Sequence, residues 1–74
     1  MKEYIVIYEQ GQESEEPWGA FVPDLPGCIS TGDSYETAQR NIREAIQLHL
    51  EGLKAEGIPI PEPTARFEKI AFAA

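Results

Sequence analysis

The sequence contains one long hydrophobic repeat of helical period, and this single repeat limits the folds that the chain can adopt. Between Tyr35 and Glu56, apolar side chains recur at helical spacing and fall on one stripe. The stripe consists of Tyr35, Ala38, Ile42, Ala45, Ile46, His49 and Leu53. The opposite face carries Glu36, Arg40, Glu44, Gln47 and Glu51. Because one helix covers only one face of a sheet, a second apolar sheet face must be covered by something else.

Capping residues set the bounds of this predicted helix. Asp33 and Glu36 stand in the register of a capping box, with Ser34 as the competing N-cap. Gly57 is placed to end the helix. From residue 58 to 63 proline alternates with other residues, which excludes a helix and predicts an extended, stiff spacer.

Short runs of β-branched and aromatic residues before the helix predict strands over residues 4–8, 18–22 and 28–31. A polar hairpin tip over residues 10–16 joins the first two runs and predicts antiparallel pairing. The prolines and glycine between residues 23 and 27 predict a fixed corner before the third strand. Residues 66–72 alternate in part, which predicts a fourth strand that pairs within the sheet or with another chain.

These elements predict an α+β fold of order β-β-β-α-β, with a three- to four-stranded, mainly antiparallel sheet and one helix packed on one face. We expect a single domain over residues 1–74. Both alternating sets of side chains in the strand over residues 4–8 are apolar, so both sheet faces need cover. A domain of this size buries only about 60% of its unfolded surface, and the one cysteine, Cys28, excludes an intramolecular disulfide. We therefore expect a homodimer or homotetramer.

The net charge of −7 argues against nucleic-acid binding, because such binders use Lys and Arg to neutralise phosphates. An acidic surface instead attracts a basic protein partner. Glu13, Glu15 and Glu16 concentrate negative charge in the hairpin tip. The sequence has no long apolar segment near its start, so we expect a soluble, cytoplasmic protein without membrane attachment.

Four residues have side chains that invite a chemical role. Cys28 is either a nucleophile with His49 as its base, or a small buried hydrophobe; His49 also fits a packed histidine. Asp24 either caps the backbone amides that follow it or points into a cleft, and Trp18 is either core or a partner-facing anchor. The sequence has no glycine-rich phosphate loop, Ser/His/Asp set or metal-ligand spacing, so we expect no catalytic, cofactor or metal site.

A motif in the middle of the chain resembles that of a known family. An aromatic residue and an alanine precede Pro23, Asp24, Leu25, Pro26, Gly27 and Cys28, and Gly32-Asp33-Ser34 then opens the helix that carries Ala38. This pattern resembles the HicB-like antitoxin family over residues 3–63. The resemblance implies a partial ribonuclease-H-like fold without ribonuclease-H catalytic residues, in dimers or larger assemblies. It also implies a partner, HicA, a small basic toxin that cleaves messenger RNA and whose catalytic surface the antitoxin covers.

Many members of that family carry an additional DNA-binding segment, whereas only residues 57–74 follow the predicted helix here. We therefore expect no direct nucleic-acid binding. The leading interpretation is an antitoxin module with Glu15, Glu16, Trp18 and Asp24 as candidate partner-binding residues. A stand-alone oligomeric binding or adaptor protein is the second interpretation, and an enzyme using Cys28, His49 or Asp24 is the third.

Overall fold

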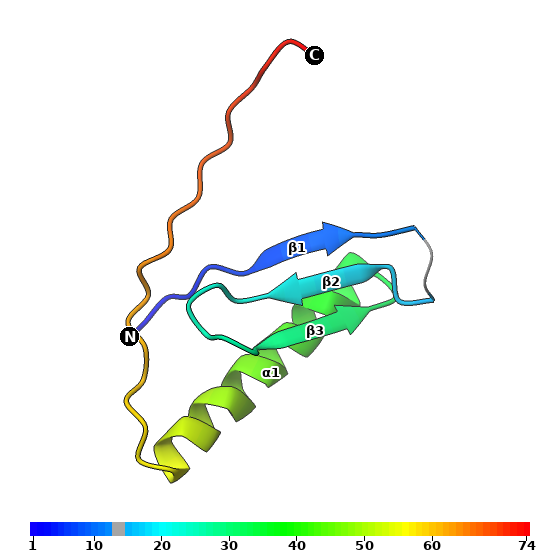
Figure 1. Ribbon diagram of the computed structural model, residues 1–74. Helices are drawn as coiled ribbons and strands as arrows, with labels where there is room; N and C mark the ends of the chain where they lie inside the picture. The colour runs from blue at the N-terminus through cyan, green and yellow to red at the C-terminus, as the bar shows by residue number, and fades with distance from the viewer. Residues whose placement is uncertain (13–14) are drawn as a thin grey trace.

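The computed structural model describes residues 1–12 and 15–74 and shows three antiparallel strands followed by one helix (Figure 1). The strands are β1 (Ile7–Gln10), β2 (Trp18–Phe21) and β3 (Ile29–Gly32), and the helix is α1 (Tyr35–Ala55). The sheet order is β1-β2-β3, and α1 lies across one face of it. The predicted α+β class and the helix on one face are confirmed. Glu13 of the predicted hairpin tip lies outside the described residues.

Strand β1 is shifted toward the C-terminus relative to its prediction. Ile7 pairs with Phe21 and Gln10 pairs with Trp18, so the polar end of the run belongs to the strand. Residues 4–6 alternate as predicted, with Tyr4 and Val6 packed against the core, yet they have no ladder. Residues 4–6 have no partner because the neighbouring strand, β2, ends at Phe21 and Pro23 beyond it has no N–H to donate. The predicted antiparallel pairing of the first two strands is confirmed, whereas the paired residues of β1 begin three positions later than predicted.

The corner between β2 and β3 closes on its own backbone. Leu25 N donates to Val22 O at 3.1 Å, Cys28 N donates to Leu25 O at 3.0 Å, and Val22 N donates to Cys28 O at 3.2 Å. Gly27 has a φ of 84°, a conformation that favours glycine. Because Cys28 closes this turn, β3 begins one residue later than predicted and ends at Gly32.

The core lies between the sheet and α1. Its buried residues are Ala20, Val22, Leu25, Cys28, Ala38 and Ile42. Partly buried side chains from residues 4–8 and from α1 pack around them: Tyr4, Val6, Tyr8, Ala45, Ile46 and Leu50. The predicted stripe of the helix is thus the face that meets the sheet.

The ends of α1 follow the predicted sequence signals with one correction. Ser34, and not Asp33, is the N-cap: its backbone is extended and its Oγ accepts a hydrogen bond from Thr37 N at 3.1 Å. At the other end Gly57 has a φ of 71°, and Ile58 N donates to Leu53 O at 2.9 Å. The helix therefore ends where the glycine was expected to end it.

The C-terminal part of the chain differs from its prediction. After α1 the described residues form no further strand, and residues 66–72 extend away from the sheet (Figure 1). Before that point the chain passes the N-terminus, where Tyr4 Oη donates to Pro61 O and Lys2 Nζ forms an ion pair with Glu62. The predicted fourth strand is not formed within this chain because the segment meets no sheet edge of its own.

Candidate functional site

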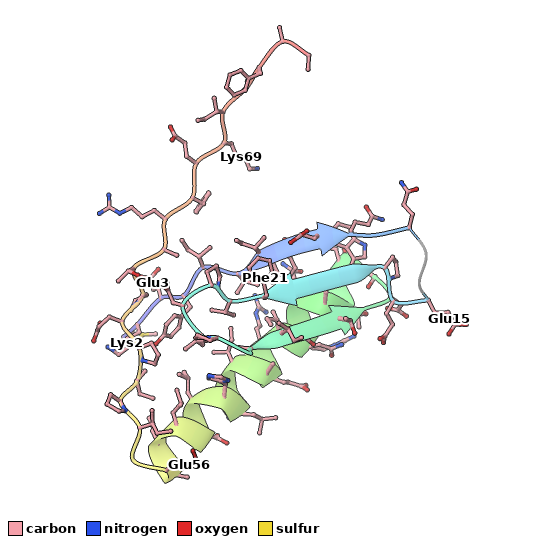
Figure 2. The ribbon with its side chains drawn as sticks, in the orientation of Figure 1. Lys2, Glu3, Glu15, Phe21, Glu56 and Lys69 are labelled. Carbon is pink, nitrogen blue, oxygen red and sulfur yellow. The ribbon has the colours of Figure 1, made fainter. Side chains whose placement is uncertain are left out.

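The acidic residues of the predicted partner-binding set lie beside the hairpin that joins β1 and β2. Glu15 is exposed at this end of the sheet (Figure 2). The Glu16 carboxylate accepts a hydrogen bond from Thr31 Oγ1 of the neighbouring strand at 2.8 Å. The hairpin therefore presents the Glu15 and Glu16 carboxylates at one end of the molecule, with Glu16 bonded to β3.

Trp18 adds an aromatic surface next to these carboxylates. Its ring is half-buried and lies 5.2 Å from the Tyr35 ring, between centroids, at a tilt of 57°. Tyr8 meets the same Tyr35 ring edge-on at 4.9 Å. Burial, and secondarily the charge of Tyr35, raises the pKa of Tyr8, while Arg43 opposes the shift. The sequence left two interpretations of Trp18 open, a core residue or an anchor that faces a partner. The structure places Trp18 in an aromatic cluster at the start of α1, partly in contact with solvent.

Asp24 lies at the other end of β2, so the structure does not bring it together with Glu15 and Glu16. Its carboxylate accepts hydrogen bonds from Thr64 N at 3.1 Å, Ala65 N at 3.0 Å and Thr64 Oγ1 at 3.1 Å. The expectation that Asp24 caps the amides that follow it is wrong, because its carboxylate bonds to Thr64 and Ala65, while Leu25 N and Cys28 N donate to carbonyls of the corner itself. Asp24 instead attaches the C-terminal segment to the corner, and we name this contact the Asp24 clasp.

Replacing Asp24 with alanine is expected to release residues 64 and 65 from the corner. Hydrogen bonds to a charged group contribute about 1.5–3 kcal/mol when sheltered, and partial solvent exposure here reduces this toward about 1 kcal/mol. Amide hydrogen exchange should show loss of protection at Thr64 and Ala65, with little change in α1. The exposed Glu68→Ala is the matched control, since it removes a carboxylate near the same segment. Unchanged protection at both amides in Asp24→Ala would contradict the clasp.

Cys28, the candidate nucleophile, has the surroundings of a packed thiol. Cys28 is 3% exposed, and burial raises the pKa of its thiol above the ordinary value of 9.0. His49 lies half-buried on α1. A thiol held in its neutral form by apolar surroundings fits the packing interpretation of Cys28.

Alkylation of Cys28 by iodoacetamide is therefore expected to be slower than alkylation of free cysteine at every pH from neutral to mildly alkaline. Burial raises the pKa of the Cys28 thiol in the folded chain, so the buried neutral thiol stabilises the fold fully at pH values below the ordinary thiol pKa. This contribution to the free energy of unfolding decreases as the pH rises above the ordinary thiol pKa. The rate should rise to the free-cysteine value when urea unfolds the chain. A folded protein that reacts faster than free cysteine would instead support a nucleophilic thiol.

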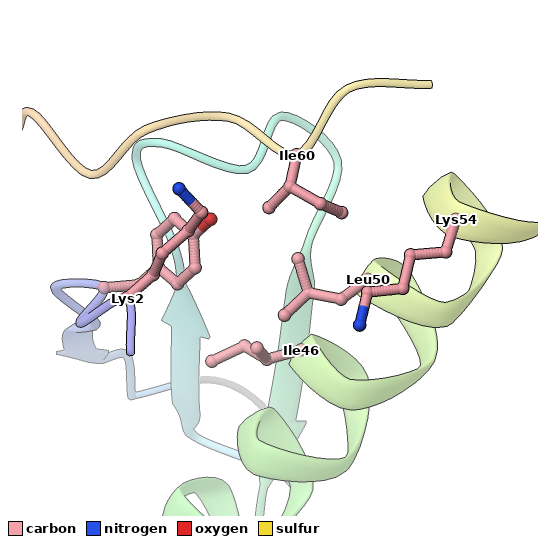
Figure 3. A pocket seen from close by; sticks show the side chains of 6 residues that line it. Lys2, Ile46, Leu50, Lys54 and Ile60 are labelled. Carbon is pink, nitrogen blue, oxygen red and sulfur yellow. The ribbon is translucent and has the colours of Figure 1, made fainter. Parts of the chain in front are cut away.

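The structure also shows a pocket that the sequence did not predict. It has a volume of about 290 Å³ and is lined by Lys2, Tyr4, Ile46, Leu50, Lys54 and Ile60 (Figure 3). The lining comes from the N-terminus, from α1 and from the spacer after it, which are distant in sequence. Within residues 1–12 and 15–74, no cluster of His, Cys, Asp and Glu is arranged to hold a metal ion. The same residues contain no helix with the length and apolar character needed to cross a membrane.

Comparison with known proteins connects this arrangement to a family. The model of the HicB-like antitoxin of bacterial toxin-antitoxin systems matches residues 4–72. A UPF0150 protein of Helicobacter pylori is 53% identical over 45 residues, which are 61% of this chain and 62% of that protein, so the match spans less than two thirds of that relative. A UPF0150 protein of Synechocystis is 46% identical over 59 residues, covering 80% of this chain and 72% of the relative.

Solved structures give the same result for the fold. The crystal structure of TTHA0281 from Thermus thermophilus matches with a TM-score of 0.70 and 34% identity, over 76% of this chain and 68% of the other. A chain of the HicA3 and HicB3 toxin-antitoxin complex matches with a TM-score of 0.68 and 30% identity, over 85% of this chain and 70% of the other. The sheet, the corner motif and the helix are therefore those of a recognised family. The chain belongs to the HicB-like antitoxin family of bacterial toxin-antitoxin systems.

Proposed function

We propose that this chain is the antitoxin module of a type II toxin-antitoxin pair, and that it binds and inhibits a small basic HicA-like toxin that cleaves messenger RNA. The observation that carries the proposal is the similarity, over 85% of the chain and at 30% identity, to a chain of the HicA3 and HicB3 complex. In the proposed mechanism the chain covers the RNA-cleaving surface of the toxin and has no enzymatic activity of its own. Residues 1–74 act as one unit in this role.

The charge of the chain supports this choice of partner. A ribonuclease that holds RNA presents positive charge, and a protein of net charge −7 has the sign of the RNA that it would displace. Glu15 and Glu16, beside the half-buried Trp18, combine negative charge with an aromatic surface, a composition that suits a protein interface. Asp24 is the fourth residue of the proposed contact set, at the opposite end of the sheet.

Self-association and location complete the proposal. The sheet face opposite α1 carries apolar side chains, including Ile7 and the strongly exposed Ile29, which supports a homodimer or homotetramer. We place the protein in the cytoplasm, where a toxin that cleaves messenger RNA acts. We propose no direct contact with nucleic acid, in keeping with the negative charge.

The second candidate is an oligomeric binding or adaptor protein of the same fold without a toxin partner. The pocket beside α1 favours it, because an apolar hollow edged by two lysines gives the chain a surface unrelated to a toxin. A gene for a small basic protein beside the gene of this chain favours the antitoxin, and its absence favours the adaptor.

The proposal is tested by adding the chain to the cognate toxin in an RNA-cleavage assay. Cleavage should stop once the two proteins are equimolar. Reversing charge in Glu15→Lys/Glu16→Lys is expected to slow association by about tenfold at low salt, because steering depends on complementary charge. The control Glu51→Lys/Glu56→Lys makes the same change in net charge at the far end of the molecule, near Glu56 in Figure 2. Cleavage that continues in excess antitoxin contradicts the function, and equal slowing by both variants contradicts the location of the contact.

A further inference from the structure

The pocket beside α1 is an apolar hollow whose walls come from separate parts of the chain. Ile46 and Leu50 stand four positions apart on one side of the helix, and Ile60 belongs to the spacer over residues 58–63. Figure 3 shows Ile60 pointing from the spacer toward Leu50. The hollow has a volume of about 290 Å³. At about 30 Å³ each, the share of one molecule in liquid water, it has room for about ten non-hydrogen atoms.

The wall that the spacer provides is fixed in position. Tyr4 Oη donates to Pro61 O, and Lys2 Nζ forms an ion pair with Glu62. The Asp24 clasp holds the backbone directly after the spacer. The prolines within the spacer restrict its backbone further. Because these walls are in place before a ligand arrives, binding requires little ordering of the chain.

Two ammonium groups line this hollow on a chain that has few cations. The sequence has 6 Lys+Arg against 13 Asp+Glu, and two of the six are Lys2 and Lys54 of this pocket. Figure 3 shows these two side chains on opposite sides of the apolar ones. Lys2 is paired with Glu62, whereas Lys54 forms no ion pair within residues 1–12 and 15–74. The pocket therefore offers one unpaired positive charge beside an apolar hollow.

The partial negative charges at the C-terminal end of α1 are largely satisfied by the chain itself. Helix carbonyls there would otherwise oppose the binding of an anion. The carbonyls of residues 52, 53 and 54 accept hydrogen bonds from the backbone N–H groups of residues 56, 58 and 57, respectively. Glu51, three positions before Lys54, accepts a hydrogen bond from Gln47 Nε2 at 3.2 Å. The Lys54 ammonium group is thus available to a ligand.

We propose that this pocket binds a small monocarboxylate with an apolar body, the class to which medium-chain fatty acids belong. The apolar body lies among Ile46, Leu50 and Ile60, and the carboxylate pairs with Lys54. One unpaired cation matches one negative charge. A phosphate group needs several donors, and the Tyr4 hydroxyl already donates to Pro61 O. Inhibition of a toxin requires no such ligand, so this site is independent of the proposed antitoxin function.

Titration of the purified full chain with octanoate, followed by methyl NMR signals, tests the location of the site. The signals of Ile46, Leu50 and Ile60 should shift together with one dissociation constant of about 1 mM, as for a small ligand. Ile29 and Leu48 are the controls, since they are 71% and 68% exposed and lie outside the pocket. Shifts of equal size at the controls would show adsorption to any exposed apolar surface and would overturn the proposal. Unchanged pocket signals at about 10 mM octanoate would also overturn it.

A pair of variants tests recognition of the carboxylate. Lys54→Gln should weaken octanoate binding about fivefold, as expected for loss of a partly exposed ion pair. The same variant should bind uncharged octan-1-ol as the unmodified chain does. Arg40→Gln is the matched control, because it removes one positive charge from an exposed position of the same helix outside the pocket. Unchanged octanoate affinity in Lys54→Gln, or equal weakening by both variants, would contradict the proposal. Toxin inhibition is measured separately without octanoate, so failure here leaves the antitoxin proposal standing.

Discussion

Replacing Ile42 with alanine is expected to lower the free energy of unfolding by about 2–5 kcal/mol, the range for a buried isoleucine that leaves a cavity. Ile42 is fully buried where α1 meets the sheet, among Ala20, Leu25 and Cys28. A domain of 74 residues has a total stability of about 4–11 kcal/mol at the usual value per residue. One truncation at this position therefore removes a large part of it.

Urea denaturation at a fixed protein concentration checks this expectation, because the proposed self-association would make the midpoint depend on concentration. The midpoint should fall markedly while the slope of the transition stays the same. Leu48→Ala is the matched control: it truncates a long apolar side chain on the same helix, but Leu48 is 68% exposed and its loss should cost well under about 1 kcal/mol. Equal shifts from both variants would contradict the packing of α1 described here.

Replacing Gly32 with alanine is expected to have the second largest effect. A Cβ at this position would lie 2.5 Å from Ala38 N and 2.9 Å from Ala38 Cα, both backbone atoms of the first turns of α1. Backbone cannot move aside as a flexible side chain can, so the end of β3 and the start of α1 must separate. We expect a loss of about 1–3 kcal/mol or more, the usual cost of overpacking.

Gly52→Ala gives the opposite sign and serves as the control. Gly52 lies inside α1, and a Cβ added there would have no neighbouring atom within 4 Å outside its own stretch of helix. Alanine there should stabilise the chain by about 0.5–1 kcal/mol, because glycine is a poor helix former. Thermal unfolding followed by circular dichroism would show the two midpoints moving apart. A stable Gly32→Ala variant would contradict the close approach of β3 to α1.

Predictions from local periodicity succeeded where the structure depends on local sequence. The apolar stripe of the helix gave its buried face, including Ala38 and Ile42, because a helix sets the spacing of its own side chains. Gly57 likewise marked the end of α1. The choice between Asp33 and Ser34 as N-cap could not be made from sequence, since either oxygen type satisfies the same amides.

Features that depend on distant partners could not be predicted in the same way. The clasp joins Asp24 to Thr64 across 40 positions, and nothing in the residues near Asp24 indicates that partner. The start of β1 depended on where β2 loses its donors at Pro23, a property of the opposite strand. Residues 66–72 have the composition of a strand, but they pair with no edge of the sheet in their own chain. Of the partner-binding candidates, Glu15, Glu16 and Trp18 lie at one end of the sheet, whereas Asp24 at the other end holds the C-terminal segment.

We infer that the chain binds and neutralises a small basic toxin. Recovery of partners from native lysate of the source organism with the tagged chain, identified by mass, tests it most directly. We expect a small basic protein that is released by high salt, because complementary charge contributes to the contact. That protein should stop growth when produced alone, and production of this chain should restore growth. Recovery of this chain alone, with no basic partner, would contradict the claim.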